Sequence, residues 1–192
     1  MTRKTGTIPA DYFEDKYRAD IDPWQFQTSA YERAKYQATI GALAKPRYGH
    51  ALEVGCSIGV LTALLAQRCD TLLAIDASAT AIAKAQETSI PNATFQVGTL
   101  PQDFPGGRYD LIVLSEVLYY FAQADLEALA ALCIDALAPD GDIVVCHWLG
   151  ETDYPLTGQA ATGLFAQAVA VRLPVRVRLE DAEYRLERFS AT

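Results

Sequence analysis

The chain has 192 residues, a formal net charge of −8 and a hydrophobic content of 51%. Its length and apolar content predict a single folded domain spanning residues 1–192 rather than a disordered chain. The acidic charge argues against a nucleic-acid partner, because phosphate backbones are bound by clustered lysines and arginines.

The start of the chain and its cysteines predict the compartment. Basic residues near the start are not followed by an apolar stretch, so we expect no secretory signal and a cytoplasmic protein. No apolar run approaches the ~18 residues of a membrane-spanning helix, so we expect no membrane association. The four cysteines are scattered along the sequence and are expected to be packed, reduced thiols. With only two histidines, the sequence predicts no metal site.

Helices and strands are expected to alternate along the chain. Residues 1–26 are predicted to form an aromatic, acidic N-terminal extension or lid, and residues 27–192 form the core. A helix over about residues 29–44 opens the core, and Ser29 or Thr28 is its expected cap. The expected strands that follow are 51–54, 72–75, 94–97, 110–115 and 142–146. One helix is expected to begin near residue 60, and three more are expected over residues 79–88, 126–137 and 158–171.

The last part of the sequence alternates apolar and polar residues. Segments 175–179 and 184–189 have period two on either side of residues 180–182, which predicts an antiparallel hairpin. Together these elements predict a three-layer, Rossmann-like α/β fold with a mostly parallel sheet that ends in a C-terminal antiparallel hairpin.

Residues 50–76 are the most informative stretch for function. Glu53 lies near the end of the first expected strand, a turn from Gly55 to Gly59 follows, and Asp76 closes the second strand. Glycines allow a close approach of the backbone to a ligand, and the next helix offers free N–H groups. An acid about 20 residues after such a turn can accept hydrogen bonds from ribose hydroxyls. The stretch therefore predicts a site for a nucleoside-bearing ligand.

Three interpretations of this turn compete. A dinucleotide-binding turn requires G-x-G-x-x-G, and the glycine spacing here fits it poorly. The turn also matches G-x-S-x-G, the nucleophile elbow of α/β-hydrolases, and Ser57, Asp110 or Asp125, and His147 could form a triad. An elbow, however, normally follows several strands and an oxyanion loop, which the preceding fifty or so residues do not contain.

The third interpretation is the acidic glycine loop, E/D-x-G-x-x-x-G, of class I S-adenosylmethionine-dependent methyltransferases. Glu53, Gly55 and Gly59 match that pattern. Further motifs make the chain resemble the nodulation protein S family of these enzymes over about residues 12–189. The matching motifs are Asp22-Pro23-Trp24, Tyr31-Glu32-Arg33-x-Lys35-Tyr36, residues 52–62, 68–76 and 109–120, and Cys146-His147-Trp148.

The resemblance implies S-adenosyl-L-methionine as cofactor. It also implies N-methylation of the free amine of a deacetylated chitooligosaccharide during synthesis of the lipochitooligosaccharide nodulation factor. A methyltransferase acting on another small molecule, a protein that binds a nucleoside without catalysis, and the serine hydrolase remain alternatives. The oligomeric state is not readable from the sequence.

The carboxyl ends of the strands predict where the cofactor binds. Asp76 is the expected ribose ligand, or else a helix cap. Glu53 is expected to orient the methionine end of the cofactor, or else to pair with a basic residue of the preceding helix. The full set of predicted cofactor residues is Arg33, Glu53, Gly55, Cys56, Ser57, Gly59, Asp76, Ala77, Thr99, Leu100 and Ser115, with Thr99 and Leu100 beside the adenine and Arg33 on the cofactor carboxylate.

The acceptor amine must attack as the free base, so a residue that takes a proton or holds the amine is useful. Glu116 and His147 are the predicted catalytic residues, since each follows a strand end. Trp24, Tyr119, Tyr120 and Trp148 are predicted substrate-binding residues that would stack on sugar rings or enclose the sulfonium, although core packing is an alternative for each.

Overall fold

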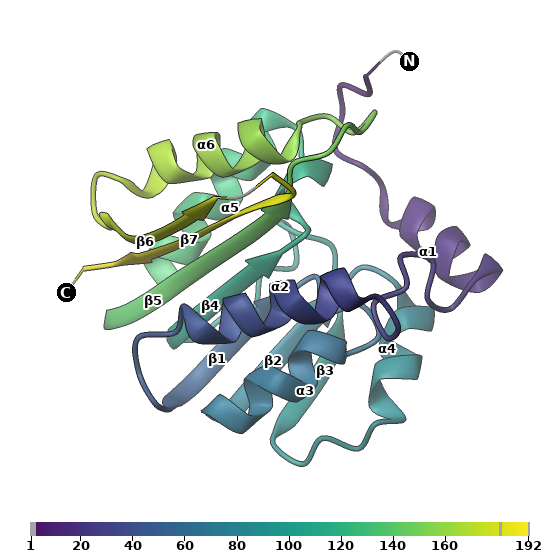
Figure 1. Cartoon of the computed structure of the whole chain (residues 1–192), viewed down its shortest axis with the longest axis horizontal. Helices are drawn as coiled ribbons and strands as arrows, with labels where there is room; N and C mark the ends of the chain where they lie inside the picture. Colours follow the sequence, from purple (N-terminus) through teal and green to yellow (C-terminus); the bar gives the residue numbers. More distant parts are fainter. Residues whose placement is uncertain (1–2, 181, 192) are drawn as a thin grey trace.

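The computed structural model describes residues 3–180 and 182–191 (Figure 1). The first two residues of the expected N-terminal extension and Asp181 of the expected hairpin turn therefore lie outside the described part. Within it, seven strands form one sheet in the order β3-β2-β1-β4-β5-β7-β6. The strands are β1 (Tyr48–Val54), β2 (Cys69–Asp76), β3 (Ala93–Val97), β4 (Tyr109–Ser115), β5 (Leu137–Trp148), β6 (Val175–Glu180) and β7 (Tyr184–Ser190).

The first five strands are parallel to one another, and β7 is antiparallel to both β5 and β6. The predicted fold, a mostly parallel sheet that ends in an antiparallel hairpin, is confirmed. Buried apolar residues dominate the central strands, because helices cover both of their faces.

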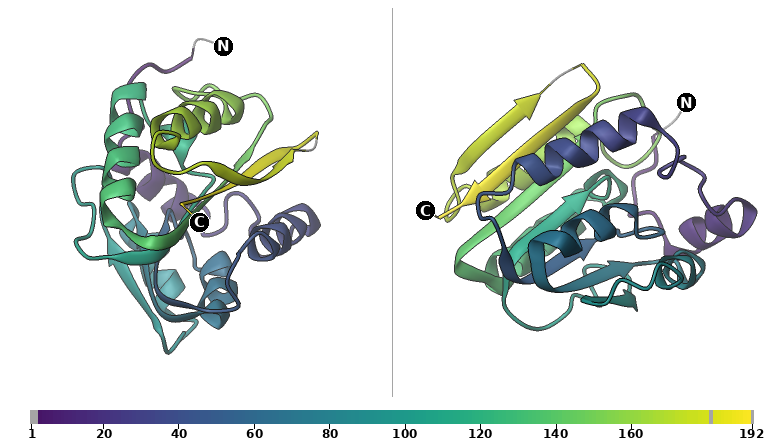
Figure 2. Two further views of the ribbon diagram at one scale, coloured as in Figure 1. Left: turned by 90° about the vertical axis from the view of Figure 1, so that its left-hand side faces the viewer. Right: turned by 60° about the horizontal axis from the view of Figure 1, so that its bottom comes forward.

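Helices pack on both sides of the sheet (Figure 2). They are α1 (Ala10–Ala19), α2 (Ala30–Gly41), α3 (Val60–Leu65), α4 (Ala79–Gln86), α5 (Gln123–Ala136) and α6 (Gly158–Val169), with short 3-10 turns η1 (Ala66–Arg68) and η2 (Leu118–Tyr120). One core cluster joins α5 and α6 to Ile112, Leu114, Ile143 and Val145. The other joins α2 and α3 to Leu72, Leu111 and Val113. Neighbouring residues of a strand point to opposite faces, so the two clusters use alternate positions.

Two elements differ from the sequence-based prediction. Residues 10–19 form the helix α1, whereas the sequence predicted only an aromatic, acidic extension there. Strand β5 begins at Leu137, whereas the sequence predicted a helix up to residue 137 and a strand only from residue 142. The early start of β5 follows from pairing, because Leu137 lies opposite Tyr109 of β4.

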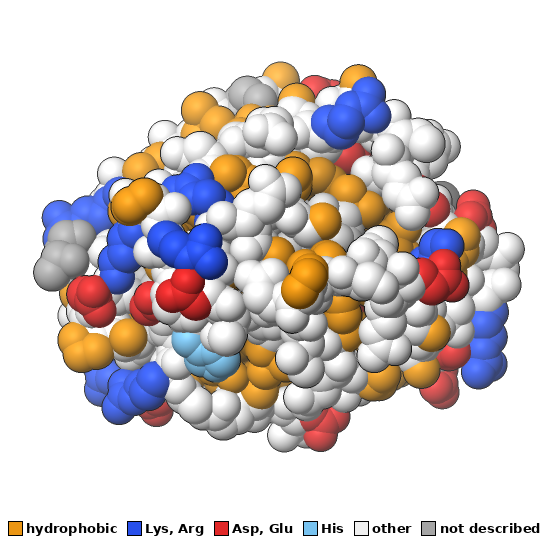
Figure 3. Space-filling model, turned by 90° about the horizontal axis from the view of Figure 1, so that it is seen from below, with side chains coloured by type: hydrophobic (Ala, Val, Ile, Leu, Met, Phe, Trp, Pro, Cys, Tyr) orange, Lys and Arg blue, Asp and Glu red, His pale blue; other side chains and the backbone are white. Residues whose placement is uncertain are grey.

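No helix of residues 3–180 and 182–191 is both long and apolar enough to cross a membrane. On the face seen in Figure 3, basic and acidic side chains are intermingled instead of forming one uniform basic surface.

Candidate functional site

A cavity of about 390 Å³ opens at the carboxyl ends of β1, β2 and β4. Its lining includes residues 53–57, 75–77, 98–100 and 115–117, which follow or end four strands of the sheet. The N-terminal segment and α2 close the other sides. Loops at the carboxyl ends of parallel strands are where open α/β sheets bind ligands, and the volume suits a small molecule.

The glycine turn after β1 shapes one wall of the cavity. Gly55 and Gly59 have φ of +76° and +83°, which side-chain-bearing residues rarely adopt. A Cβ on Gly55 would also lie 3.2 Å from the Val117 side chain. Gly55, Cys56 and Ser57 line the cavity as predicted. Gly59 precedes α3 behind the turn and is not among the described lining residues, so its role is to shape the turn.

Asp76 ties the end of β2 to this turn. Its Oδ2 accepts the N–H of Ser57 at 2.8 Å, and its Oδ1 accepts the N–H of Ser78 at 2.9 Å. The cap of α4 is Ser78, whose hydroxyl accepts the N–H of Ala81 at 3.1 Å. The alternative role of Asp76 as the helix cap is therefore wrong. Burial raises the pKa of Asp76, and the backbone N–H donors oppose that shift.

Glu53 is a buried carboxyl group at the base of the cavity. Its side chain accepts a hydrogen bond from the Thr62 hydroxyl at 2.6 Å, and the residue is 2% exposed. Its partner is thus a hydroxyl of α3, and not a basic residue of the preceding helix. Burial raises the pKa of Glu53 to about 8, so the carboxyl is mostly protonated at neutral pH. A cationic ligand group placed beside it would favour the ionised form.

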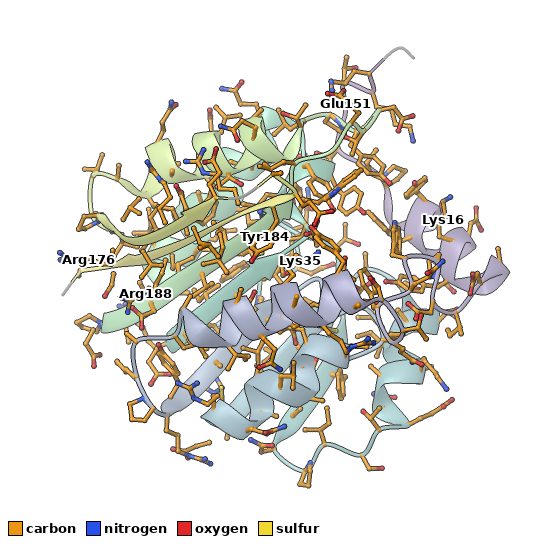
Figure 4. The ribbon with its side chains drawn as sticks, in the orientation of Figure 1. Lys16, Lys35, Glu151, Arg176, Tyr184 and Arg188 are labelled. Atoms are coloured by element: carbon orange, nitrogen blue, oxygen red, sulfur yellow. The ribbon has the colours of Figure 1, made fainter. Side chains whose placement is uncertain are left out.

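A buried lysine connects α2 to the turn after β4 (Figure 4). Lys35, only 1% exposed, donates to Glu32 at 2.9 Å and to Glu116 at 2.6 Å. The Glu116 carboxylate also accepts the Tyr119 hydroxyl at 2.5 Å and the Trp148 N–H at 3.0 Å. The sequence places Glu32 and Lys35 in a motif shared with the family, but it assigns neither of them a role at the site. Their opposite charge three positions apart on a helix usually marks a surface pair.

His147 does not reach the cavity. Its ring is fully buried, and Nε2 accepts the N–H groups of Leu118 at 2.9 Å and Val117 at 3.3 Å. Burial lowers the pKa of His147 to about 4, so the ring is neutral at physiological pH. The predicted catalytic role is therefore corrected: the imidazole holds the turn that carries Glu116, and its acceptor nitrogen is already occupied.

The predicted role of Arg33, binding the cofactor carboxylate, is also corrected. Its side chain is exposed and donates to the Thr28 carbonyl at 2.8 Å, and it is absent from the described cavity lining. Successive helix residues are rotated by about 100°, so Arg33 and Lys35 are roughly 200° apart on α2. Lys35 faces the site, and Arg33 consequently faces solvent.

The proposed serine triad does not assemble. The Ser57 hydroxyl accepts a hydrogen bond from Tyr17 at 2.5 Å. Asp110 accepts the N–H groups of Gly49 and His50 at the start of β1, far from the strand ends that line the cavity. Because Nε2 of His147 is occupied by the backbone of the turn after β4, it is not available as a base for Ser57.

The N-terminal segment covers the cavity, and α1 lies beside α4 in both views (Figures 1 and 2). Glu14 of α1 accepts the hydroxyls of Ser78 and Thr80, each at 2.7 Å, and the Thr80 N–H at 3.1 Å. These donors hold the pKa of Glu14 at about 2. Phe13 and Tyr17 of α1 line the cavity. The segment therefore lies against the cavity, and its action as a lid stays a prediction.

The remaining predicted residues meet around the same cavity. Ala77, Thr99, Leu100 and Ser115 contribute to its lining beside Asp76 and Glu116. A second cavity of about 540 Å³ adjoins it and shares four aromatic residues with it. The shared residues are Trp24, Tyr119, Tyr120 and Trp148, the four predicted to bind substrate.

Comparison with known proteins identifies relatives. Residues 10–150 match the profile of the family described as Nodulation protein S (NodS). Nodulation protein S of Rhizobium tropici is 33% identical over 127 residues, which cover 64% of this chain and 53% of that protein. This chain spans 53–61% of the length of three such curated relatives.

Solved structures share the fold. A provisionally assigned methyltransferase from Pseudomonas syringae has 35% identity and a TM-score of 0.74, and the match covers 84% of this chain and 99% of that one. The N-methyltransferase NodS of Bradyrhizobium japonicum WM9, solved with S-adenosyl-L-homocysteine, gives a TM-score of 0.81 at 21% identity. That match covers 95% of this chain and 98% of the other.

Proposed function

The chain belongs to the Nodulation protein S (NodS) family, and we propose that it transfers a methyl group from S-adenosyl-L-methionine to an amine. The proposed acceptor is the free amine of a deacetylated chitooligosaccharide, as in nodulation-factor synthesis. The observation that carries the proposal is the cavity itself. The cavity is lined by the glycine turn, by the acid at the end of the next strand, Asp76, and by further carboxyl groups at its inner end, among them Glu53 and Glu116.

The residues present fit the cofactor. At Gly55 a φ of +76° and the tight 3.2 Å approach of a Cβ to Val117 both favour glycine, which leaves the backbone of the turn open to a ligand. We assign Asp76 to the ribose hydroxyls and Thr99 and Leu100 to the adenine, since all three line the cavity at strand ends. Glu53 would bind the ammonium of the methionine moiety, because a cation offsets the cost of ionising a buried carboxyl group.

Charge favours an amine over a carboxylic acid as acceptor. Among the described residues that line the cavity, the four carboxyl groups of Glu32, Glu53, Asp76 and Glu116 outnumber the single ammonium of Lys35. A carboxylate acceptor would be repelled by these groups, whereas an amine can donate its N–H to one of them. Glu116 is the group we assign to hold the acceptor N–H.

S-adenosyl-L-methionine, when bound, would supply an electrophilic methyl carbon to the amine nitrogen, and the sulfur would leave with the electron pair of the C–S bond. The protein must hold the acceptor in line, which contributes up to roughly 7–11 kcal/mol in well-oriented systems. It must also receive the amine uncharged. An amine of pKa ~10.4 is neutral at pH 7 at a cost of about 4.6 kcal/mol, and a less basic sugar amine costs less. We assign Glu116 to orient the neutral amine and to accept the proton that leaves the methylated product.

The aromatic residues and the N-terminal segment complete the proposed site. Trp24, Tyr119, Tyr120 and Trp148 would stack on the sugar rings, since they surround the junction of the two cavities. The lid formed by the N-terminal segment would exclude water from the sulfonium, which strengthens electrostatic interactions inside.

The test uses the purified full chain in two steps. Calorimetry with S-adenosyl-L-homocysteine measures cofactor binding, and mass spectrometry follows methyl transfer from S-adenosyl-L-methionine to a deacetylated chitooligosaccharide. We expect binding, and one methyl group on the free terminal amine. The fully acetylated oligosaccharide, which has no free amine, is the matched negative control.

Each failure identifies a different error. Absence of cofactor binding would refute the cofactor assignment. Binding without transfer to the deacetylated sugar would refute the acceptor assignment. Complete loss of activity in Ser57→Ala would favour a hydrolase using Ser57, because methyl transfer needs no serine nucleophile.

A further inference from the structure

We propose that Lys35 is a positioning residue that orients the Glu116 carboxylate toward the acceptor amine. The inference rests on the proposed function, because Glu116 is assigned there to hold the acceptor. Lys35 lines the inner wall of the cavity from α2, although almost none of its side chain is exposed. Its ammonium lies between two carboxylates and 4.9 Å from the centre of the Tyr31 ring. It is thereby fixed in place.

Glu116 needs such support because its backbone is strained. Its φ is +57°, in the left-handed region that residues with side chains rarely adopt. Strained residues of this kind persist only where surrounding interactions determine them, and they gather at functional sites. The backbone N–H of Glu116 donates to the Cys146 carbonyl at 2.9 Å, which fixes one side of the residue. The carboxylate is fixed separately by side-chain and backbone donors.

Three donors meet the carboxylate, and part of it still faces the cavity. Oε1 accepts Lys35 at 2.6 Å, Oε2 accepts the Tyr119 hydroxyl at 2.5 Å, and the Trp148 N–H lies 3.0 Å from Oε1 and 3.2 Å from Oε2. Glu116 lines the cavity, and 12% of its side chain is exposed. Because Lys35 holds Oε1 on the α2 side, the exposed part of the carboxylate is available to an acceptor N–H.

Two other roles for Lys35 give different results in an experiment. The ion pairs could be purely structural, since buried pairs can often be replaced without loss of stability. Lys35 could instead bind the carboxylate of the cofactor, the role that the sequence assigned to Arg33. The three roles separate because acceptor KM, cofactor affinity and thermal stability are independent measurements.

The experiment compares Lys35→Met, Lys35→Arg and the double variant Glu32→Gln/Lys35→Met. Lys35→Met removes the ammonium but keeps most of the length of the side chain. The double variant removes one charge of each sign, so it keeps the balance of the cluster if Lys35→Met alone is too unstable. Lys45→Met is the control, because Lys45 forms an exposed pair with Asp140 that lies outside the cavity.

We expect the acceptor KM to rise roughly tenfold or more in Lys35→Met and in the double variant, since small misplacements of a binding group cost about that much or more. The affinity of these variants for S-adenosyl-L-homocysteine should stay at the wild-type value. Lys35→Arg, which keeps the positive charge, should have an acceptor KM much closer to that of the wild type than Lys35→Met has. The control should match wild type in every measurement.

Three outcomes overturn the inference. An unchanged acceptor KM in a folded variant would make Lys35 structural. A parallel loss of affinity for S-adenosyl-L-homocysteine would assign Lys35 to the cofactor. A wild-type protein that binds the cofactor but methylates no amine would refute the proposed function itself, and the positioning role would be refuted with it.

Discussion

Replacing Glu53 by glutamine should flatten the pH dependence of folding stability in the ligand-free protein. The pKa of Glu53 is raised by burial to about 8, from an ordinary value of 4.5. Between these two pH values the folded chain holds a proton that the unfolded chain releases. The free energy of unfolding therefore falls as the pH rises through this interval, and it is higher at the acidic end.

The size of the effect follows from the two pKa values. Between about pH 5.5 and about pH 7.5, Glu53 alone should lower the free energy of unfolding by about 2–3 kcal/mol, at ~1.36 kcal/mol per pKa unit. His147 acts in the opposite direction, because burial lowers its pKa from 6.5 to about 4. Its contribution raises stability by about 1 kcal/mol over the same interval. The difference between wild type and Glu53→Gln isolates the glutamate.

Urea unfolding of the ligand-free proteins at the two pH values measures this difference. Glu127→Gln is a suitable control, because Glu127 is exposed and lies on α5 away from the cavity. Equal pH dependence in wild type and Glu53→Gln would refute the buried, protonated carboxyl.

The same variant tests ligand binding. Affinity of the wild type for S-adenosyl-L-homocysteine should rise from about pH 6 to about pH 7.5, by at most about tenfold per pH unit, because the ligand ammonium requires ionised Glu53. In Glu53→Gln the affinity should be lower and nearly independent of pH. Calorimetry at three pH values distinguishes the two profiles, and a wild-type affinity that is constant over this range would contradict the assigned contact.

Three further predictions concern single residues. Asp76→Ala should weaken binding of S-adenosyl-L-homocysteine by about 1–3 kcal/mol in calorimetry, because ribose hydroxyls lose their acceptor, while the exposed Asp70→Ala leaves it unchanged. His147→Gln should lower the free energy of unfolding by about 1–3 kcal/mol in urea without moving the pH optimum of methyl transfer; a displaced optimum would restore His147 as a base. Glu14→Ala should increase proteolysis of α1 and weaken cofactor binding, because three hydrogen bonds to α4 are lost, whereas the exposed Asp11→Ala should behave as wild type in both assays.

The fold could be predicted from the sequence because its strands coincide with short apolar runs. Residues 111–114, for example, are all apolar, and β4 is covered by helices on both faces. The helix α1 could not be predicted in this way. Five of its ten residues are charged, and its apolar stripe is short, with Phe13 and Tyr17 four positions apart on the face that lines the cavity. The contacts of Glu14 with α4 join residues more than sixty positions apart, and no local pattern encodes them.

The site was predictable where a strand end determines it, and not where side chains from different elements meet. Asp76 and Glu116 reach the cavity because each follows a parallel strand. His147 ends a strand too, but the strand position alone does not reveal that its ring points beneath the turn and accepts two backbone N–H groups. Arg33 and Lys35 are both basic residues of one helix, and only the orientation of α2 on the sheet decides which of them is buried.

Four carboxyl groups around one cavity would repel one another if all were bare anions, and the structure compensates each of them by a different means. Glu53 is stabilised as the neutral acid, since burial raises its pKa to about 8. Asp76 is held by backbone N–H groups. Lys35 shares its one positive charge between Glu32 and Glu116. A cation placed beside Glu53 would favour its ionised form, and the part of Glu116 that faces the cavity can accept an N–H. A ligand pair made of a cationic cofactor and an amine satisfies both, which a carboxylic acid acceptor would not.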